Sequence, residues 1–160
     1  MENSQIQAII LDPCCGSRMF YFDKMDKRVL FGDIRDEAHL LCDGRELQIR
    51  PDERMDFRQL PFNDCTFKAV VFDPPHLKRA GEKSWIGKKY GILSDDWRND
   101  LRSGFAECFR VLDTNGVMIF KWSEVQIPLS EIIALTPYKP VIGHRSGKQA
   151  NTHWILFIKP

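Results

Sequence analysis

Four consecutive residues near the middle of the chain carry the residue types best suited to catalysis: Asp73, Pro74, Pro75 and His76. They follow the apolar run 69–72, which predicts a buried strand that ends at Asp73. Two prolines in a row fix the backbone and remove two N–H donors, so carbonyl oxygens stay free to accept hydrogen bonds. The Asp73 carboxylate and the Pro74 carbonyl can then hold both hydrogens of a ring-conjugated amine and point its lone pair at an electrophile, while His76 stacks on the ring. These four residues are the catalytic candidates.

A turn of small residues follows the first apolar run of the chain, residues 6–11, and would let a ligand approach the backbone closely. Its spacing is not that of the G-x-G-x-x-G turn of dinucleotide-binding proteins, because Arg18 and Met19 stand where a second glycine is expected. An ordinary strand-to-helix turn is the alternative interpretation. The residues that we expect to contact a cofactor in this turn are Asp12, Pro13, Cys14 and Gly16.

Two further acidic residues stand where they would suit a nucleoside. Asp33 follows the second apolar run, residues 28–31, about 20 residues after the first turn, and can bind both hydroxyls of a ribose. Asp36 is a competing candidate, and a solvated turn aspartate is the alternative role for Asp33. Asp56 can accept a hydrogen bond from an adenine amino group, with Phe57 beside the ring. A strand end followed by a core phenylalanine is the simpler interpretation of that pair.

Basic and aromatic residues are interleaved over residues 76–91, directly after the catalytic candidates. Basic groups suit phosphates and aromatic rings suit unstacked bases, so the segment predicts contact with nucleic acid. Its three glycines suggest a mobile loop that orders on substrate or cofactor, with a solvated surface loop as the alternative. A second polar segment, residues 143–149, either contacts substrate or only connects two strands. The candidate substrate contacts are Lys78, Arg79, Trp85, Lys88, Lys89, Tyr90 and Arg145.

The pattern of apolar residues predicts the elements that must bring these motifs together. Apolar residues three and four apart predict a helix over residues 94–112, which ends at Asn115-Gly116, and Asp43-Gly44 predicts a hairpin within residues 39–51. Strands that alternate with helices or loops imply an α/β domain with a largely parallel sheet, where ligands bind at the carboxyl ends of the strands. The predicted strands are residues 6–11, 28–31, 55–57, 69–72, 117–122, 141–143 and 152–158, and the predicted short helices are 17–24 and 130–135.

Composition narrows the class of protein. With 160 residues, 43% of them hydrophobic and 28% charged, the chain suits one globular domain over residues 1–160. A net charge of +1 means that any basic surface for nucleic acid has to be local. Five cysteines without a Cys-x-x-Cys pair predict a reducing cytoplasm and no metal site. No apolar run approaches the roughly 20 residues that span a bilayer.

The four motifs, in their order along the chain, resemble those of class I S-adenosylmethionine-dependent methyltransferases. The Asp-Pro-Pro motif resembles the Asp-Pro-Pro-aromatic motif of the amino-methyltransferases that act on adenine N6 or cytosine N4. The segments 60–67 and 109–117 are also typical of class I enzymes, so the likeness covers most of residues 10–122. The version with histidine, together with residues 120–122 and 152–154, is similar to small methyltransferase-like proteins of bacteriophages and prophages. The resemblance implies a Rossmann-like fold with a C-terminal antiparallel strand, and S-adenosyl-L-methionine as cofactor.

Carried over residue by residue, the resemblance makes Asp33 the ribose ligand, Asp56 and Phe57 the adenine pocket, and residues 73–76 the catalytic loop. The sequence departs from the family pattern at two points. The turn after residues 6–11 lacks its last glycine, and His76 replaces tyrosine, phenylalanine or tryptophan. The leading hypothesis is an adenine-N6 methyltransferase that acts on DNA in the cytoplasm of a bacterial or phage-infected cell. Because no separate target-recognition domain is evident, specificity would be low, or would come from a homodimer, a partner subunit or a single-stranded substrate.

Three alternatives remain at the level of the sequence. RNA adenine keeps the same chemistry on another nucleic acid, and a glutamine side chain keeps it on a protein. The third alternative, a non-catalytic subunit that binds the cofactor or nucleic acid, is left open by the missing glycine and by His76. The intact Asp-Pro-Pro motif favours an enzyme over that subunit.

Overall fold

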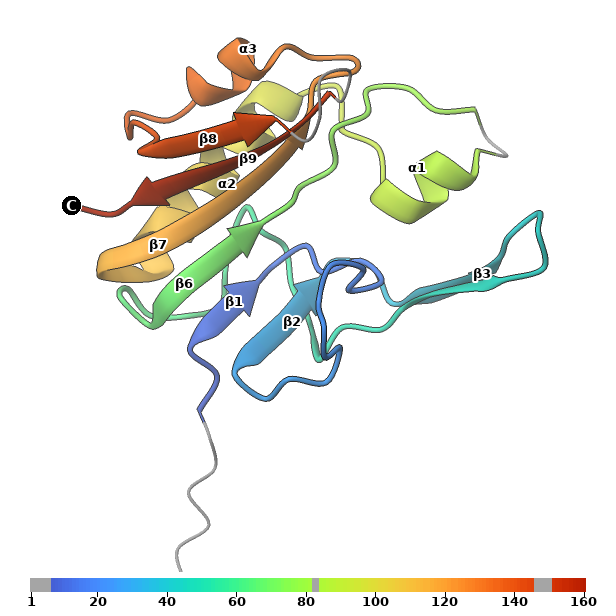
Figure 1. Cartoon of the computed structure of the whole chain (residues 1–160), viewed down its shortest axis with the longest axis horizontal. Coiled ribbons are helices and arrows are strands. Elements are labelled where there is room, and N and C mark those ends of the chain that lie inside the picture. Colours follow the sequence, from blue (N-terminus) through green and yellow to red (C-terminus); the bar gives the residue numbers. More distant parts are fainter. Residues whose placement is uncertain (1–6, 82–83, 146–150) are drawn as a thin grey trace, which may run out of the picture.

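The computed structural model describes residues 7–81, 84–145 and 151–160. Seven strands form one sheet in the order β5-β2-β1-β6-β7-β9-β8, and two strands form a separate hairpin, β3-β4 (Figure 1). The strands are β1 (Ile10–Asp12), β2 (Val29–Asp33), β3 (Glu37–Leu40), β4 (Glu46–Ile49), β5 (Glu53–Arg54), β6 (Phe67–Phe72), β7 (Leu112–Ser123), β8 (Ile142–Arg145) and β9 (Thr152–Ile158).

Parallel pairing joins every pair of neighbouring strands from β5 to β7. Strand β9 runs in the direction opposite to the other six strands of this sheet, antiparallel to β7 on one side and to β8 on the other. The α/β prediction, with a largely parallel sheet and a C-terminal antiparallel strand, is confirmed. Because parallel strands end at the same edge, the segments that follow β1, β2, β5 and β6 converge there, and α1 and the hairpin extend from that edge (Figure 1).

The helices are α1 (Trp85–Tyr90), α2 (Trp97–Val111) and α3 (Leu129–Ile133). Helix α2 lies behind the sheet in Figure 1 and buries Trp97, Leu101, Phe105 and Phe109 against it, as the helical spacing predicts. Glycine at position 104 permits the close approach, because a Cβ there would come within 2.8 Å of the buried Phe72 ring. The core between α2 and the sheet thus holds β6 and β7 rigidly in place.

A smaller apolar cluster occupies the other face of the sheet. Cys15, Val29 and Phe31 are its buried members, and Ile10 and Tyr21 pack against them. Side chains of successive strand residues point to opposite faces, which is why Ile10 joins this cluster while its neighbour Leu11 joins the main core. The cluster fastens the turn after β1 to β2.

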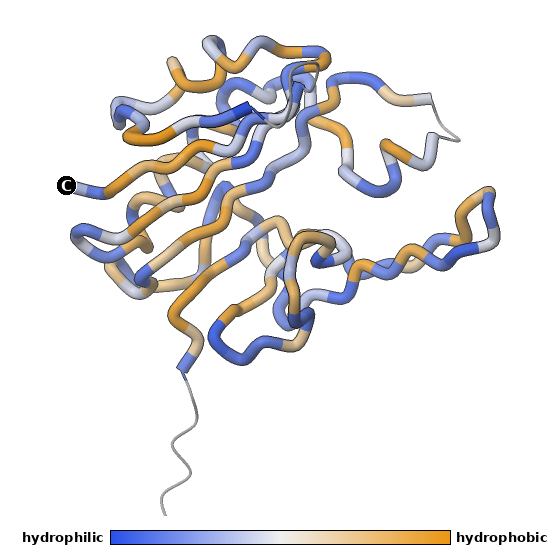
Figure 2. Tube along the Cα trace, viewed as in Figure 1, coloured by the Kyte–Doolittle hydropathy of each residue, from blue (hydrophilic) through white to orange (hydrophobic). Residues whose placement is uncertain are grey.

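The hairpin that the Asp43-Gly44 pair predicts is present between β2 and β5. Gly44 has a φ of 82°, the left-handed conformation that glycine adopts without steric cost. Figure 2 shows polar and apolar residues alternating along both hairpin strands, whereas the sheet strands are mainly apolar. The hairpin therefore replaces the helix that usually crosses between two parallel strands at this point of an α/β fold.

Four predicted elements need correction. Residues 17–24 form turns rather than a short helix, because the Asp23 and Asp26 carboxylates accept hydrogen bonds from backbone N–H groups two residues on and stabilise turns. The third strand is β5, which ends just before the predicted 55–57. Asn115-Gly116 lies inside β7, where Asn115 has a φ of 60°, so the helix already ends at Val111. Helix α1 forms inside the segment expected to be a loop.

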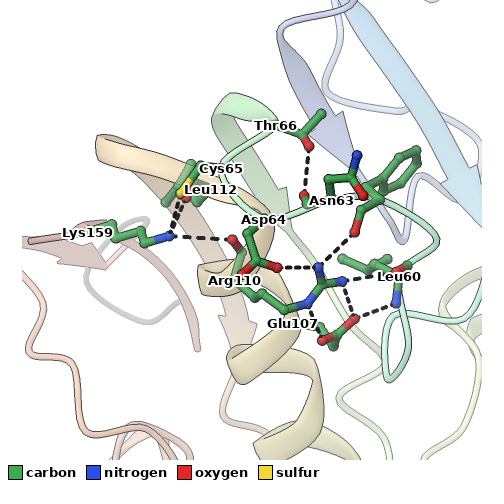
Figure 3. Close-up of polar contacts among 10 residues, drawn as sticks. Leu60, Asn63, Asp64, Cys65, Thr66, Glu107, Arg110, Leu112 and Lys159 are labelled. Atoms are coloured by element: carbon green, nitrogen blue, oxygen red, sulfur yellow. Dashed lines mark hydrogen bonds and ion pairs between the residues drawn. The ribbon is translucent and has the colours of Figure 1, made fainter.

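Arg110 of α2 ties the loop before β6 to the helix, as Figure 3 shows. Its guanidinium donates to both carboxylate oxygens of Glu107 at 2.7 and 2.8 Å, and to Asp64 at 2.9 Å. It also donates to the carbonyl oxygens of Phe62 at 2.7 Å and Leu60 at 3.0 Å. All the N–H directions of the fork are thereby used, which fixes the approach to β6 and hence the position of the loop that follows it.

The described residues contain neither a membrane-spanning helix nor a cluster of metal-binding side chains. No helix in residues 7–81, 84–145 and 151–160 is long and apolar enough to cross a membrane. Within the same ranges, no three or more His, Cys, Asp and Glu side chains gather in a way that could hold a metal ion.

Candidate functional site

A cavity of about 240 Å³ opens at the carboxyl ends of the parallel strands. Its walls come from the turn after β1, the end of β2, the segment after β5, the loop after β6, the end of α1, and β7. The predicted site residues that line it are Pro13, Cys14, Gly16, Asp33, Asp56, Phe57, Asp73, Pro74, Pro75, Lys89 and Tyr90. The fold thus brings together residues from all four sequence motifs.

Asp12 closes β1 but lies behind the cavity wall, fully buried. One of its carboxylate oxygens accepts from the Cys14 N–H at 3.1 Å, and the other accepts from the Tyr21 hydroxyl at 2.8 Å. Burial raises the pKa of Asp12 to about 7, and the nearby Asp73 and Asp33 add to the rise. Asp12 therefore shapes the turn through hydrogen bonds rather than by touching the cavity.

Arg18 is one of the two residues that stand where a second glycine is expected in the turn after β1, and its φ of 57° is left-handed. A side chain in that conformation costs roughly 1–2 kcal/mol. The guanidinium of this buried residue donates to the Lys24 and Arg50 carbonyl oxygens at 2.5 and 2.7 Å and to Asp52 at 3.0 Å. It also lies 4.0 Å from the centre of the Phe31 ring. The backbone thus keeps the glycine-like turn, and the contacts of the arginine side chain offset its strain.

Asp33 ends β2, and its carboxylate reaches the cavity wall. It accepts from the Gly16 N–H at 3.0 Å, and so connects the ends of β1 and β2. Arg35 donates to it from its backbone N–H at 2.9 Å and from its guanidinium Nε at 3.1 Å. Another guanidinium nitrogen of Arg35 donates to the Lys88 carbonyl of α1 at 3.0 Å. Asp36, the competing candidate, is instead paired with Arg50 at 2.6 Å, and does not line the cavity.

Asp56 and Phe57 form the next part of the wall. Arg58 donates to the Asp56 carboxylate from its backbone and side chain, at distances down to 2.6 Å, and holds the pKa of Asp56 below its ordinary value. The ring of Phe57 packs edge-on against Phe72 at 5.4 Å between centroids, and it lies under Gly104 of α2. Phe57 thus belongs both to the core and to the cavity.

Asp73, in the loop after β6, and Lys121, on β7, form an ion pair in the wall of the cavity. The Lys121 Nζ lies 3.0 Å from the Asp73 Oδ2, and the side chains are only 18% and 14% exposed. Burial raises the pKa of Asp73, while the ammonium of Lys121 opposes that rise. Pro74 and Pro75 continue the wall beyond Asp73, so the predicted proline pair does reach the cavity.

His76 is buried and does not line the cavity. Its ring centroid lies 5.2 Å from that of Tyr90 and 6.2 Å from that of Trp122. Burial, followed by the positive charge of Lys121, lowers the pKa of His76 to about 4, which keeps the imidazole neutral at pH 7. The aromatic residue that faces the cavity beside the prolines is Tyr90.

The basic and aromatic segment divides into two parts. Its second half folds into α1, where Lys89 and Tyr90 line the cavity and the Lys89 ammonium lies 5.3 Å from the Tyr90 ring centre. The ring of Trp85, at the start of the helix, is 46% exposed. Lys78 lies outside the cavity, and its ammonium is 5.5 Å from the ring centre of Trp97.

The remaining substrate candidates lie away from the cavity as well. Arg79, Lys88 and Arg145 are not among its lining residues. Arg145 forms an ion pair with Glu124 at 3.1 Å on the edge strand β8. The rest of that polar segment, residues 146–149, lies outside the described residues.

Four charged residues of the cavity were not predicted as site residues: Arg35, Arg58, Asp100 and Lys121. Arg35 and Arg58 each stand two residues after a predicted carboxylate, and the repeated Asp-x-Arg spacing is a signal that could have indicated paired side chains. Lys121 had a weaker signal, a lone charge within the apolar run 117–122. Its partner is 48 positions away in the chain, so only the sheet register brings the two together.

No protein-family model matches the sequence, and no curated protein is significantly similar to it. Solved structures do share the fold. The PH0226 protein of Pyrococcus horikoshii superposes with a TM-score of 0.61 at 15% identity, covering 94% of this chain and 81% of its own. A TehB-like SAM-dependent methyltransferase of Corynebacterium glutamicum gives 0.57 at 15% identity, with 96% and 81% covered. An rRNA methylase of Streptococcus thermophilus gives 0.54 at 12% identity, with 96% and 88% covered.

The chemistry of the cavity residues suits a ligand that contains an adenosine. Two carboxylates at adjacent strand ends suit the hydroxyls and amino groups of an adenosine, and Phe57 offers an apolar surface for a ring. Gly16 has a φ of 51° and no side chain, and a Cβ there would meet only the Lys89 carbonyl at 4.0 Å, so the turn leaves room for a ligand. The chain therefore has the Rossmann-like fold found in S-adenosylmethionine-dependent methyltransferases.

Proposed function

We propose that the protein is an S-adenosylmethionine-dependent N-methyltransferase that methylates an exocyclic amine, with N6 of adenine in DNA as the target. The observation that carries the proposal is the position of Asp73, Pro74 and Pro75 in the wall of the cavity that Gly16 and Asp33 also line. Strands β1 and β6 are hydrogen-bonded neighbours, so the cofactor turn and the acceptor loop leave the sheet side by side.

On the cofactor side, the bound group supplies a methyl carbon made electrophilic by its sulfonium. Gly16 and its neighbours provide backbone contacts, and Asp33 accepts hydrogen bonds from the ribose hydroxyls once the Arg35 side chain turns aside. Asp56 accepts from the adenine amino group, and Phe57 packs on the ring. The Arg58 side chain holds Asp56 ionised for that role.

On the acceptor side, the Asp73 carboxylate and the Pro74 carbonyl accept hydrogen bonds from the target amine. These bonds orient the nitrogen lone pair toward the methyl carbon, which is catalysis by positioning and electrostatics. Transfer of the methyl group to the amine would leave a surplus proton on the nitrogen, and the Asp73 carboxylate would accept this proton and pass it to solvent. Tyr90, rather than the buried His76, stacks on the acceptor ring in this proposal.

Residues of α1 support a nucleic acid as the substrate. Lys89 and Tyr90 at the cavity, and the exposed Trp85, combine positive charge with rings that can stack on bases. A duplex base would have to be flipped out to enter, whereas a single strand offers it directly. Adenine in RNA and a glutamine side chain remain the alternative acceptors, and target selection would come from a second copy or a partner subunit.

The test is transfer of a labelled methyl group from S-adenosylmethionine to unmodified DNA, followed by nucleoside mass spectrometry. The proposal predicts N6-methyladenine with the wild type and at least a 100-fold lower rate with Asp73→Ala, while the cofactor Kd changes little. Asp113→Ala is the matched control, because Asp113 lies at the opposite end of the same pair of strands and pairs with Lys68. Equal transfer by Asp73→Ala and the wild type would overturn the mechanism, and label found only in RNA or protein would move the target to that class.

A further inference from the structure

Lys121 lies in a setting that normally binds a cation from outside the protein. Its Nζ is 3.0 Å from the Asp73 Oδ2. Three aromatic rings surround the same nitrogen, with centres 5.4 Å away for Phe20, 5.8 Å for Tyr90 and 5.6 Å for Trp154. A carboxylate together with ring faces is an arrangement that recognises ammonium groups. The chain therefore fills an ammonium site with its own lysine.

The rings come from three separate elements, so the site depends on the tertiary fold. Phe20 belongs to the turn after β1, Tyr90 ends α1, and Trp154 pairs with Lys121 across β7 and β9. Phe20 and Tyr90 line the cavity with Lys121 and Asp73. The lysine thus stands at the point where the target amine of the proposed reaction must meet Asp73.

The pair determines what Asp73 can do. A buried carboxyl group tends to stay protonated, and in that form it donates a hydrogen bond from one oxygen instead of accepting with both. The ammonium of Lys121 favours the carboxylate. Asp12 at the end of β1, with Cys14 and Tyr21 in the turn that follows, lie close enough to interact with the charge of Asp73, and none of the three carries a positive charge. Lys89 and Tyr90 of α1 line the same cavity, and the neutral His76 follows Asp73 by three residues. Lys121 is the cation that contacts the Asp73 carboxylate directly.

We infer that Lys121 positions Asp73 as a hydrogen-bond acceptor and determines substrate specificity, by excluding charged alkylammonium groups so that only an uncharged amine conjugated to a ring or carbonyl is accepted. The inference rests on the proposed function, and it narrows the substrate class of the same site. An alkylammonium would have to displace Lys121 from the same carboxylate and rings. A neutral aromatic amine needs only a free acceptor position on Asp73 and carries no like charge.

The first test does not depend on activity. The ionisation of Asp73 is followed by carboxyl-carbon NMR in the wild type, Lys121→Met and Lys121→Arg. We expect the pKa of Asp73 to rise by about 1 to 3 in Lys121→Met and to stay near the wild-type value in Lys121→Arg. Lys68→Met is the matched control, because it removes a lysine–aspartate pair at the other end of β6 and β7 and should leave Asp73 unchanged. An unchanged pKa in Lys121→Met would overturn the positioning role.

The second test uses n-propylammonium as the probe. The proposal predicts that Lys121→Ala binds it in the cavity, with shifts of the Tyr90 and Trp154 NMR signals, at least tenfold more tightly than the wild type or Lys68→Ala. Equal binding by all three proteins would overturn the specificity role. Absence of methyl transfer to nucleic acid and to protein alike, together with the two predicted results, would refute the proposed function while leaving the assignment of Lys121 intact.

Discussion

The Arg35 side chain occupies the carboxylate of Asp33, the residue placed to bind the ribose of a cofactor. The backbone N–H and the Nε of Arg35 both donate to the Asp33 Oδ1, at 2.9 and 3.1 Å, while the Gly16 N–H donates to the Asp33 Oδ2 at 3.0 Å. A carboxylate has about four acceptor positions, so few are left for two ribose hydroxyls. Arg35 also donates to the Lys88 carbonyl of α1, and its release would free that helix end.

Arg35→Met should therefore tighten the binding of S-adenosylmethionine. The variant removes the competing guanidinium but keeps the backbone N–H, and we expect a Kd about three- to tenfold lower, since hydrogen bonds to charged groups contribute about 1.5–3 kcal/mol before the cost of rearrangement. Asp33→Asn should weaken binding at least tenfold. Isothermal titration calorimetry measures both values, and Asp36→Asn is the control that should change nothing. Weaker binding by Arg35→Met would show that the guanidinium helps to hold the cofactor.

Gly104→Ala should damage both stability and the cofactor site. The added Cβ would lie 2.6 Å from the Phe57 Cδ2 and 2.8 Å from the Phe72 Cζ, distances that force a ring or the helix to move. Overpacking of this kind costs about 1–3 kcal/mol, and a displaced Phe57 would raise the cofactor Kd. Urea denaturation and calorimetry provide the two measurements. Ser103→Ala, on the exposed side of the same helix turn, is the control and should leave both unchanged.

Much of the fold was predictable because it depends on local patterns. The apolar runs predicted β9 with its observed bounds and β2 and β6 with small errors in theirs, and the Asp43-Gly44 pair predicted the hairpin. The carboxylates at Asp33 and Asp73 were predictable for the same reason, since each directly follows an apolar run that must end at the ligand-binding edge of a parallel sheet.

The remaining features depend on contacts between distant residues. Arg18 adopts a conformation typical of glycine because the Arg50 carbonyl oxygen and the Asp52 carboxylate, both far along the chain, hold its side chain. Lys121 reaches Asp73 only through the register of β6 and β7. Helix α1 has no buried residue, so its sequence lacks the apolar stripe that would have predicted it.

Arg110→Met should destabilise the protein by about 1–3 kcal/mol, because it leaves Glu107 and two loop carbonyls without their charged donor (Figure 3). Arg110→Lys should recover little of the loss, since an ammonium cannot reproduce the planar fork. Urea denaturation would measure the effect. Arg102→Met is the control, because the exposed Arg102 lies on the same helix and donates to Asn99 of that helix. Full recovery in the lysine variant would show that charge alone holds the loop.

Two buried groups should make the stability depend on pH in opposite directions. Burial raises the pKa of Asp12 from 3.8 to about 7, so the folded state binds the extra proton between those values and the contribution of Asp12 to stability falls as pH rises. Burial lowers the pKa of His76 from 6.5 to about 4, so the unfolded state binds the extra proton and the contribution of His76 rises with pH over that range. The two effects largely oppose each other in the wild type.

Single variants should separate the two effects. The free energy of unfolding of Asp12→Asn, minus that of the wild type, should rise by about 1.4 kcal/mol per pH unit at most between about pH 4 and 7. The same difference for His76→Gln should fall with a similar slope between about pH 4 and 6.5. Asp26→Asn is the control, because the pKa of the exposed Asp26 is about 2 in the folded protein against an ordinary value of 3.8, so its difference should stay flat above about pH 5. Urea denaturation at unit pH steps gives all three. A flat difference for Asp12→Asn would mean that Asp12 is ionised in the folded protein throughout this range, and that the Tyr21 and Cys14 hydrogen bonds outweigh its burial.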